Sequence, residues 1–176
     1  VPGAGTHVPL YILGSSLFGA RLAAMLGLPY AFASHFAPAA LLDAIEIYRR
    51  EFQPSDQLAE PYAIAGVNVI AADSDDDALD QWQTVRRSRV ARFVAPGRDL
   101  SDDEADAVLE SPQGRQIAQM MHYSAVGTPG HVKTYLDEFA ERAGVDELIT
   151  AHASPAIDQR LRSVDLLADA MDPVTV

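Results

Sequence analysis

Two serines stand where a short apolar run gives way to a helical pattern, an arrangement well suited to binding an anion. Gly14, Ser15 and Ser16 follow the apolar run Leu10–Leu13 directly. Free backbone N–H groups and the positive end of the helix dipole favour a phosphate at a helix start, and serine hydroxyls add donors. The residues therefore predict a phosphate site, with a plain N-cap role for Ser15 or Ser16 equally open and compatible with it.

A strand, a helix and a second strand must position this turn. The run Leu10–Leu13 has the length and composition of a strand buried on both faces. Apolar residues then recur at spacings of three and four until Gly27, which suits a left-handed cap, and Pro29 prevents continuation. The second apolar run, Tyr30–Ala33, follows at once. This βαβ pattern predicts a parallel sheet.

Two more strands are expected downstream, which gives four: near residues 10–13, 30–34, 62–72 and 146–151, each followed by a helix. Gly66 interrupts the third and indicates a bulge or a close backbone approach. The acidic run Asp73–Asp77 lacks the spacing of a calcium loop and is read as a helix start. Ser101 and Glu104 have the spacing of a capping box that opens a further helix. Helical sequence between about Asp102 and Tyr123, broken at Ser111, is interpreted as an insertion.

Composition narrows the function classes. The 176 residues are 48% hydrophobic, as in a globular domain, and 13 basic against 25 acidic side chains give a net charge of −12. This charge opposes binding to nucleic acid or to an anionic membrane. There is no cysteine, so we expect a cytoplasmic protein, and no histidine and carboxylate pattern indicates a metal site. No apolar run is long enough for a membrane span.

Six blocks resemble one known family, the luciferase-like flavin-dependent monooxygenases, which are TIM barrels related to bacterial luciferase. The blocks, in order, are LGSSLFGARLAAMLGLPYAFASHFAP from Leu13, YRREFQPSDQL from Tyr48, PYAIAGVNVIAADSDDDA from Pro61, VGTPGHVKTYL from Val126, GVDELITAHA from Gly144 and RLRSVDLLA from Arg160. They cover nearly the whole chain but match only the carboxyl-terminal half of the family. The resemblance implies an α/β fold that is the C-terminal half of a (β/α)8 TIM barrel, with four parallel strands and their helices.

Members of this family are longer than this chain, since a full barrel needs roughly 250 residues or more. The resemblance therefore implies that residues 1–176 are the C-terminal half of a luciferase-like domain within a longer chain. Four strands alone would leave two open edges and an uncovered face. We therefore expect a fragment, a homo-oligomer or pairing with a missing N-terminal half. A monomer of 176 residues in solution would contradict these expectations.

The resemblance also implies a function. It predicts an enzyme that uses reduced FMN and O2 to oxidise a small organic substrate, with a flavin reductase supplying the reduced FMN. The flavin phosphate is expected near Gly14, Ser15 and Ser16. The deazaflavin F420 as cofactor of a related oxidoreductase, and a non-catalytic flavin-binding half-barrel, remain open alternatives.

Histidines at strand ends are the titratable candidates, because catalytic residues of a TIM barrel emerge there. His35 follows the second strand and is predicted to act in the site, although a packing role with its ring bonded to backbone is equally open. His152 follows the last strand and is a weaker candidate, whereas His122 is expected at the surface. Thr128 is expected to be an ordinary N-cap rather than a phosphate ligand.

Overall fold

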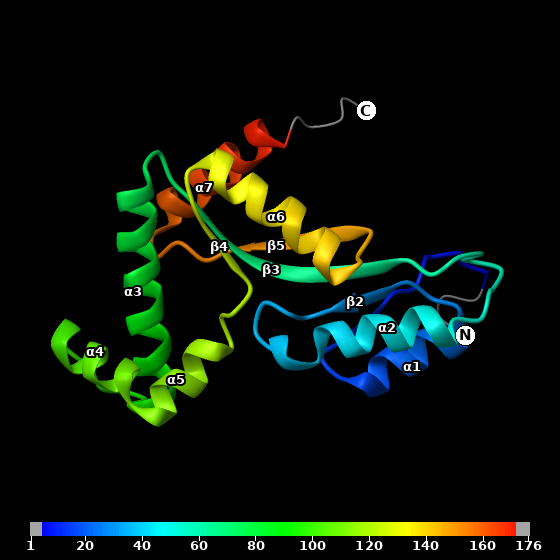
Figure 1. Ribbon diagram of the computed structural model, residues 1–176, viewed down its shortest axis with the longest axis horizontal. Helices are drawn as coiled ribbons and strands as arrows, with labels where there is room; N and C mark the ends of the chain where they lie inside the picture. Colours follow the sequence, from blue (N-terminus) through cyan, green and yellow to red (C-terminus); the bar gives the residue numbers. More distant parts are fainter. Residues whose placement is uncertain (1–4, 172–176) are drawn as a thin grey trace.

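Five parallel strands form one sheet in the computed structural model, which describes residues 5–171 (Figure 1). The predicted domain 1–176 also includes residues 1–4 and 172–176, which lie outside the described residues. The strands are β1 (Ile12–Gly14), β2 (Tyr30–Phe32), β3 (Ala63–Ala71), β4 (Ser124–Gly127) and β5 (Glu147–His152). The helices are α1 (Leu17–Leu26), α2 (Leu41–Glu51), α3 (Asp75–Val94), α4 (Asp102–Glu110), α5 (Pro112–Gln119), α6 (Pro129–Ala143) and α7 (Ile157–Ala170), with a 3₁₀ turn η1 (Pro38–Ala40) before α2.

Strand β3 is the centre of the sheet, and all nine of its residues are buried. Strand β2 pairs with Ala63–Ala65, and β5 pairs with the overlapping stretch Ile64–Val69, so these two strands lie on opposite edges of β3. Strand β1 pairs with β2 in parallel register. The order β1, β2, β3, β5 with intervening helices is the parallel α/β arrangement expected for half of a TIM barrel, and this prediction is confirmed.

The prediction of four strands was wrong by one strand, because β4 also joins the sheet. It pairs with Asn68–Ala71 of β3, on the same edge as β2 but further along. Only Ala125 and Gly127 of its four residues are buried. Such a short and partly polar run has no pattern that distinguishes it, in the sequence, from the neighbouring helices and turn.

Successive side chains along β3 point to opposite faces of the sheet. One face packs against α1, α2, α6 and α7 in a single apolar core, in which the largest fully buried side chains are Tyr30, Tyr48, Phe32 and Phe139. The β3 residues in this core are Ala63, Ala65, Val67, Val69 and Ala71. Four helices on one face of a parallel sheet correspond to the outer layer of a barrel.

The opposite face is only partly covered. Ile70 packs under Ala78 and Trp82 at the start of α3. Leu13 and Ile149, which lie on the edge strands β1 and β5, keep 71% and 52% of their surface exposed. Both residues alternate with neighbours that contact the helix-covered core, so they belong to the face that lines the interior of a complete barrel. The bare inner face predicted from the sequence is therefore present.

The predicted insertion folds as α4 and α5 against α3, with an apolar cluster of its own around Val90 and Leu109 (Figure 1). Arg87 of α3 donates to both Asp106 oxygens, at 2.8 and 2.5 Å, and to Asp102 at 2.6 Å. Ser101 and Glu104 form the predicted capping box at the start of α4. The insertion is thus fastened to α3 rather than to the sheet.

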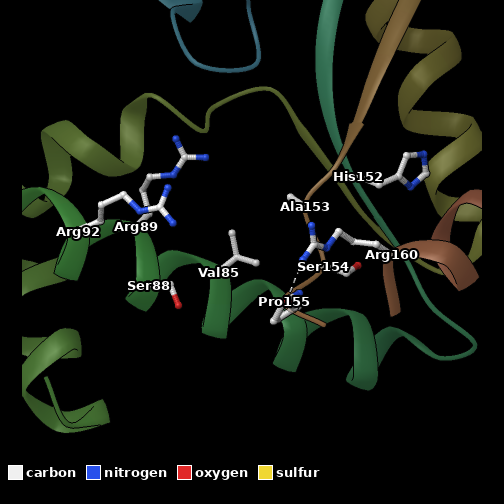
Figure 2. Close-up of a pocket in the computed structure, with 9 residues that line it drawn as sticks. All are labelled: Val85, Ser88, Arg89, Arg92, His152, Ala153, Ser154, Pro155 and Arg160. Carbon is white, nitrogen blue, oxygen red and sulfur yellow. Dashed lines mark hydrogen bonds between the residues drawn. The ribbon is translucent and has the colours of Figure 1, made fainter. Parts of the chain in front are cut away.

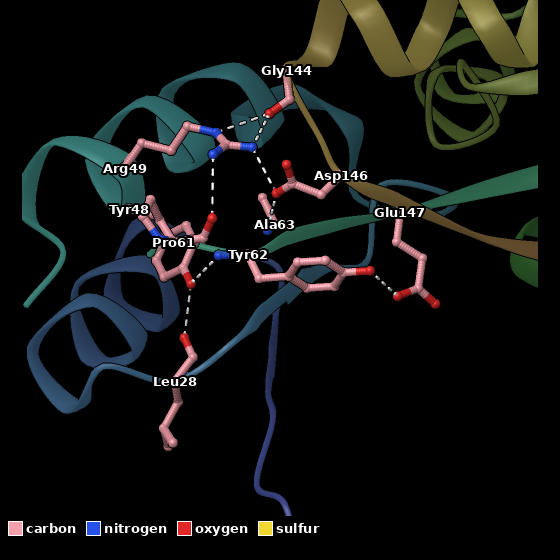
Figure 3. A network of polar contacts seen from close by, with 9 residues as sticks. All are labelled: Leu28, Tyr48, Arg49, Pro61, Tyr62, Ala63, Gly144, Asp146 and Glu147. Carbon is pink, nitrogen blue, oxygen red and sulfur yellow. Dashed lines mark hydrogen bonds and ion pairs between the residues drawn. The ribbon is translucent and has the colours of Figure 1, made fainter. Parts of the chain in front are cut away.

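A polar network at the amino ends of β3 and β5 fixes the helices to the sheet (Figure 3). The Arg49 guanidinium of α2 donates to the Gly144 carbonyl at 2.7 Å and to Asp146 Oδ2 at 2.8 Å. The same Asp146 oxygen accepts the Ala63 N–H at 2.7 Å. In a barrel, this amino-terminal end is associated with stability, and the carboxyl ends of the strands carry the chemistry.

Candidate functional site

The carboxyl ends of the strands meet at one edge of the sheet and bring together residues that are distant in sequence. The Ala33 N–H, just past β2, donates to the Gly14 carbonyl at 2.8 Å. The Ala153 N–H, just past β5, donates to the Val69 carbonyl at 3.0 Å. The Gly14–Ser16 turn, His35 and His152 therefore all lie at or just past strand ends that meet at this edge.

The Gly14–Ser16 turn links β1 to α1, as the sequence predicts. Ser16 occupies the N-cap position of α1, but its side chain makes no capping hydrogen bond. Ser15 and Ser16 are both exposed, and neither hydroxyl has a hydrogen-bond partner within residues 5–171. Of the two roles left open, capping by the serine side chain is not seen. The hydroxyls and the first N–H groups of α1 are free to bind an oxyanion.

Tyr30 fixes this turn through its hydroxyl and its ring. Its hydroxyl donates to the Ser16 carbonyl at 3.0 Å, and burial raises the pKa of Tyr30 to about 12, so the phenol stays protonated as a donor. The Tyr30 ring leaves little room around Gly14 and Gly19, where an added Cβ would lie 3.3 Å from the phenol oxygen or ring. The two glycines let the start of α1 lie close to the end of β1. The turn is consequently held in place by Tyr30, while its two serine side chains stay exposed.

His35 is half-buried beside β3. Its Nδ1 would lie 2.3 Å from a Cβ placed on Gly66, so Gly66 makes the close approach that the sequence indicated, without a bulge. The Asn68 amide donates to the His35 carbonyl at 2.7 Å, and the preceding Ser34 hydroxyl donates to the Gly66 carbonyl at 2.5 Å. These bonds fix the loop after β2 to the central strand.

The His35 ring itself lacks the backbone bond that a purely packing role would provide at Nδ1. This atom is buried and has no hydrogen-bond partner among the described residues. Burial, and then the positive charge of Arg89, lower the pKa of His35 below its usual 6.5. The imidazole is therefore neutral at pH 7.

The other predicted residues have mainly structural roles in this chain. His152 Nδ1 lies 2.7 Å from the Ser163 hydroxyl of α7, and Ser163 also accepts the Ala71 N–H at 2.9 Å. Burial lowers the pKa of His152. His122 is exposed, as expected. Thr128 is the N-cap residue of α6, but its side chain makes no capping bond.

The acidic run forms the start of α3, as predicted. Ser74 is the N-cap and accepts the Asp77 N–H at 3.2 Å. Asp75 also reaches across to α6, where it accepts the Thr128 N–H at 2.9 Å and contacts His131 Nδ1 at 2.9 Å. The Thr128 N–H and then His131 lower the pKa of Asp75. Asp75 therefore joins the starts of α3 and α6.

A basic pocket beside the strand ends has no counterpart in the predicted site. It has a volume of about 340 Å³ and lies between α3 and the loop that follows β5 (Figure 2). Arg89 and Arg92 rise from α3, and Arg160 extends from the start of α7 toward that helix. His152 and Ser154 line the side that belongs to β5. The spacing of Arg89 and Arg92, three apart on one helix, is the only sequence signal that could have placed both on one face.

Sequence comparison finds one matching family model and several similar proteins. A sequence profile described as luciferase-like monooxygenase matches residues 1–147. An Escherichia coli (strain K12) protein described as a luciferase-like monooxygenase is 35% identical over 179 residues, covering 98% of this chain and 52% of that protein. YvbT of Bacillus subtilis (strain 168) is 37% identical over 175 residues, covering 96% of this chain and 51% of that protein. The chain thus spans about half the length of these curated relatives.

Solved structures share the fold. The crystal structure of apo-MsnO8 superposes with a TM-score of 0.80 at 31% identity, over 96% of this chain and 52% of that one. More distant structures, at 16% identity, show the fold alone. They include riboflavin lyase with modified FMN, at a TM-score of 0.58 over 93% of this chain and 42% of that one. They also include an F420-dependent secondary alcohol dehydrogenase, at 0.54 over 94% of this chain and 49% of that one.

Proposed function

Because the chain belongs to the luciferase-like monooxygenase family, we propose that it is part of a flavin-dependent monooxygenase that oxidises a small organic substrate with reduced flavin and O2. We propose FMN as the cofactor, with its phosphate at Gly14, Ser15 and Ser16. A flavin reductase would supply the reduced cofactor in the cytoplasm. The activity belongs to a protein in which a homo-oligomer or a second barrel half completes the sheet.

One observation carries this proposal: two exposed serine hydroxyls without partners in residues 5–171 stand at a helix start above a parallel strand. A serine at an N-cap position ordinarily bonds back to its own helix, and Ser16 does not. The cradle formed by these groups offers several donors and a favourable dipole to a dianionic phosphate. Because the net charge of the chain is −12, such local donors are needed to hold an anion.

The residues of this chain would bind and orient the cofactor, and the bound flavin would supply the electrons for O2 chemistry. Tyr30 keeps the phosphate turn fixed by its bond to the Ser16 carbonyl. His35, neutral at pH 7 and at the end of the adjacent strand, would hold or accept a proton at a ring nitrogen. Helix α3 and the insertion would restrict access of water to the strand ends.

Flavin titrations test the phosphate assignment. Ser15→Ala and Ser16→Ala should each raise the Kd for FMN about tenfold, since a hydrogen bond to a charged group contributes roughly 1.5 kcal/mol. Riboflavin, which lacks the phosphate, should bind all variants equally. Ser101→Ala is the matched control, because Ser101 caps α4 away from the sheet. Equal losses for riboflavin and FMN would contradict the assignment.

Two alternatives from the sequence are separated by a parallel titration with F420 and by the rate of flavin oxidation. An F420-dependent oxidoreductase would bind F420 in preference to FMN, and the fold is compatible with both. A non-catalytic half-barrel is favoured by the bare inner face at Leu13 and Ile149. It would bind flavin, if at all, without accelerating the oxidation of reduced flavin by O2.

A further inference from the structure

Three arginines around one pocket have no carboxylate partner, in a chain with 25 acidic residues. They are Arg89, Arg92 and Arg160, and within residues 5–171 none of them forms an ion pair. The only hydrogen bond of these side chains is a long one, 3.4 Å from Arg160 to the Pro155 carbonyl. Seven other basic residues do pair with acids: Arg21, Arg49, Arg50, Arg87, Arg98, Lys133 and Arg162.

The arginines come from two elements that face each other. Arg89 and Arg92 are three residues apart, so they project from one face of α3. Arg160 extends from the first turns of α7 toward α3, over the loop after β5 (Figure 2). Their guanidinium groups therefore border the same pocket from opposite sides. Guanidinium forks are the side-chain groups best matched in shape to carboxylate, sulfonate and phosphate.

A buried hydroxyl strengthens the case for a polar ligand in this pocket. Ser154 lines it and is only 2% exposed, yet its Oγ has no hydrogen-bond partner among the described residues. An unpaired buried polar group costs free energy unless a bound group or water satisfies it. Ser88 adds an exposed hydroxyl on the α3 side. The pocket thus combines cationic and hydroxyl donors and contains no acid.

We propose that the pocket formed by Arg89, Arg92, Arg160 and Ser154 binds an oxyanion group of the organic substrate: a carboxylate, sulfonate or phosphate. The assignment of the occupant as substrate rests on the proposed function. Arg89, which lines the pocket, lowers the pKa of His35 through its positive charge. An anion held there would place the rest of a substrate along the strand ends, where the flavin is proposed to react.

The flavin phosphate is the competing source of an oxyanion. The Gly14–Ser16 turn follows β1, whereas the pocket follows β5, and these strands form opposite edges of the sheet. The two anion sites are thus separate in the fold, and one phosphate cannot occupy both. A cofactor that used the arginines would leave the serine turn empty.

Calorimetric titration with butanesulfonate at fixed ionic strength tests the pocket directly, with butanol as the uncharged comparison. We expect saturable binding of the sulfonate alone, and Arg89→Gln and Arg160→Gln should each raise its Kd about tenfold. Arg142→Gln is the control, because Arg142 is an exposed arginine on α6 outside the pocket. Absence of saturable binding, or equal affinity in all variants, would overturn the proposal.

Parallel titrations with FMN and riboflavin separate the two sources. If Arg89→Gln raises the Kd for FMN about tenfold and leaves the Kd for riboflavin unchanged, the pocket holds the flavin phosphate and the substrate assignment is wrong. If the variant keeps its affinity for FMN but binds butanesulfonate more weakly, the substrate assignment is supported. Arginine-dependent sulfonate binding by a protein that binds no flavin would support the anion pocket and contradict the proposed function.

Discussion

At the scale of single residues, His35 is one of three side chains in residues 5–171 that have a buried polar atom without a partner, here the ring Nδ1. Asn68 donates to its backbone carbonyl and the Ser34 hydroxyl donates to the Gly66 carbonyl, so the loop that carries His35 is fixed to β3. Nδ1 itself lies against Gly66. A neutral imidazole on a fixed loop at the carboxyl end of a strand is suited to proton transfer with a bound molecule.

His35→Gln should slow the oxidation of bound reduced flavin by O2 at least about a hundredfold, the usual contribution of a positioned acid or base, with FMN affinity within about twofold. The pKa of His35 is lowered, so the ring is neutral above pH 6.5 and protonates only below it. The wild-type rate should therefore be flat above pH 6.5 and fall on acidification. Stopped-flow rates in which the variant keeps the wild-type pH profile would exclude this role.

Residues with a local signal were predicted well, and those defined by tertiary placement were not. The serine turn was predicted because a strand, a turn and a helix are contiguous in the sequence. The arginine pocket was missed because Arg89 and Arg160 face each other only once α3 and α7 have packed on the same sheet. Unlike the strand-to-helix turn, an unpaired arginine has no signature in sequence.

At the scale of elements, Tyr48 connects three segments through one hydroxyl (Figure 3). It is fully buried, donates to the Leu28 carbonyl at 2.9 Å and accepts the Tyr62 N–H at 3.0 Å. These bonds tie α2 to the loops that lead into β2 and β3. Because these hydrogen bonds lie at the amino ends of the strands, we expect them to stabilise the fold and not to take part in the chemistry.

Tyr48→Phe should lower the free energy of unfolding by about 1–3 kcal/mol, because it leaves a partly buried carbonyl and a partly buried N–H without their partner. The affinity for FMN should be unchanged at a temperature where the variant is folded. Tyr11→Phe is the control, since Tyr11 is 57% exposed. Urea denaturation measures the difference, and an equal stability of the two variants would show that the hydroxyl bonds contribute nothing.

Element boundaries were predictable where caps mark them. Gly27 adopts the left-handed conformation at the end of α1, with φ of 62°, and Ser101 with Glu104 forms the predicted box at α4. Strand β4 has no such marker. It becomes a strand because the carboxyl half of β3 offers a free edge at Asn68–Ala71, and this long-range pairing is invisible in a four-residue run.

At the scale of the whole molecule, the sheet explains where function is expected. Helices cover one face, and the other face remains exposed at Leu13 and Ile149. The chain spans about half the length of its curated relatives. A complete barrel would cover this face and enclose the strand ends, so we expect the serine turn and the arginine pocket to border one shared mouth. None of the described helices is long and apolar enough to cross a membrane.

A crystal structure of the protein soaked with FMN tests the central claim most directly. The account predicts that the FMN phosphate oxygens lie within hydrogen-bonding reach of the Ser15 and Ser16 hydroxyls and the first N–H groups of α1. A phosphate bound instead between Arg89 and Arg160, or anywhere else away from this turn, would contradict it.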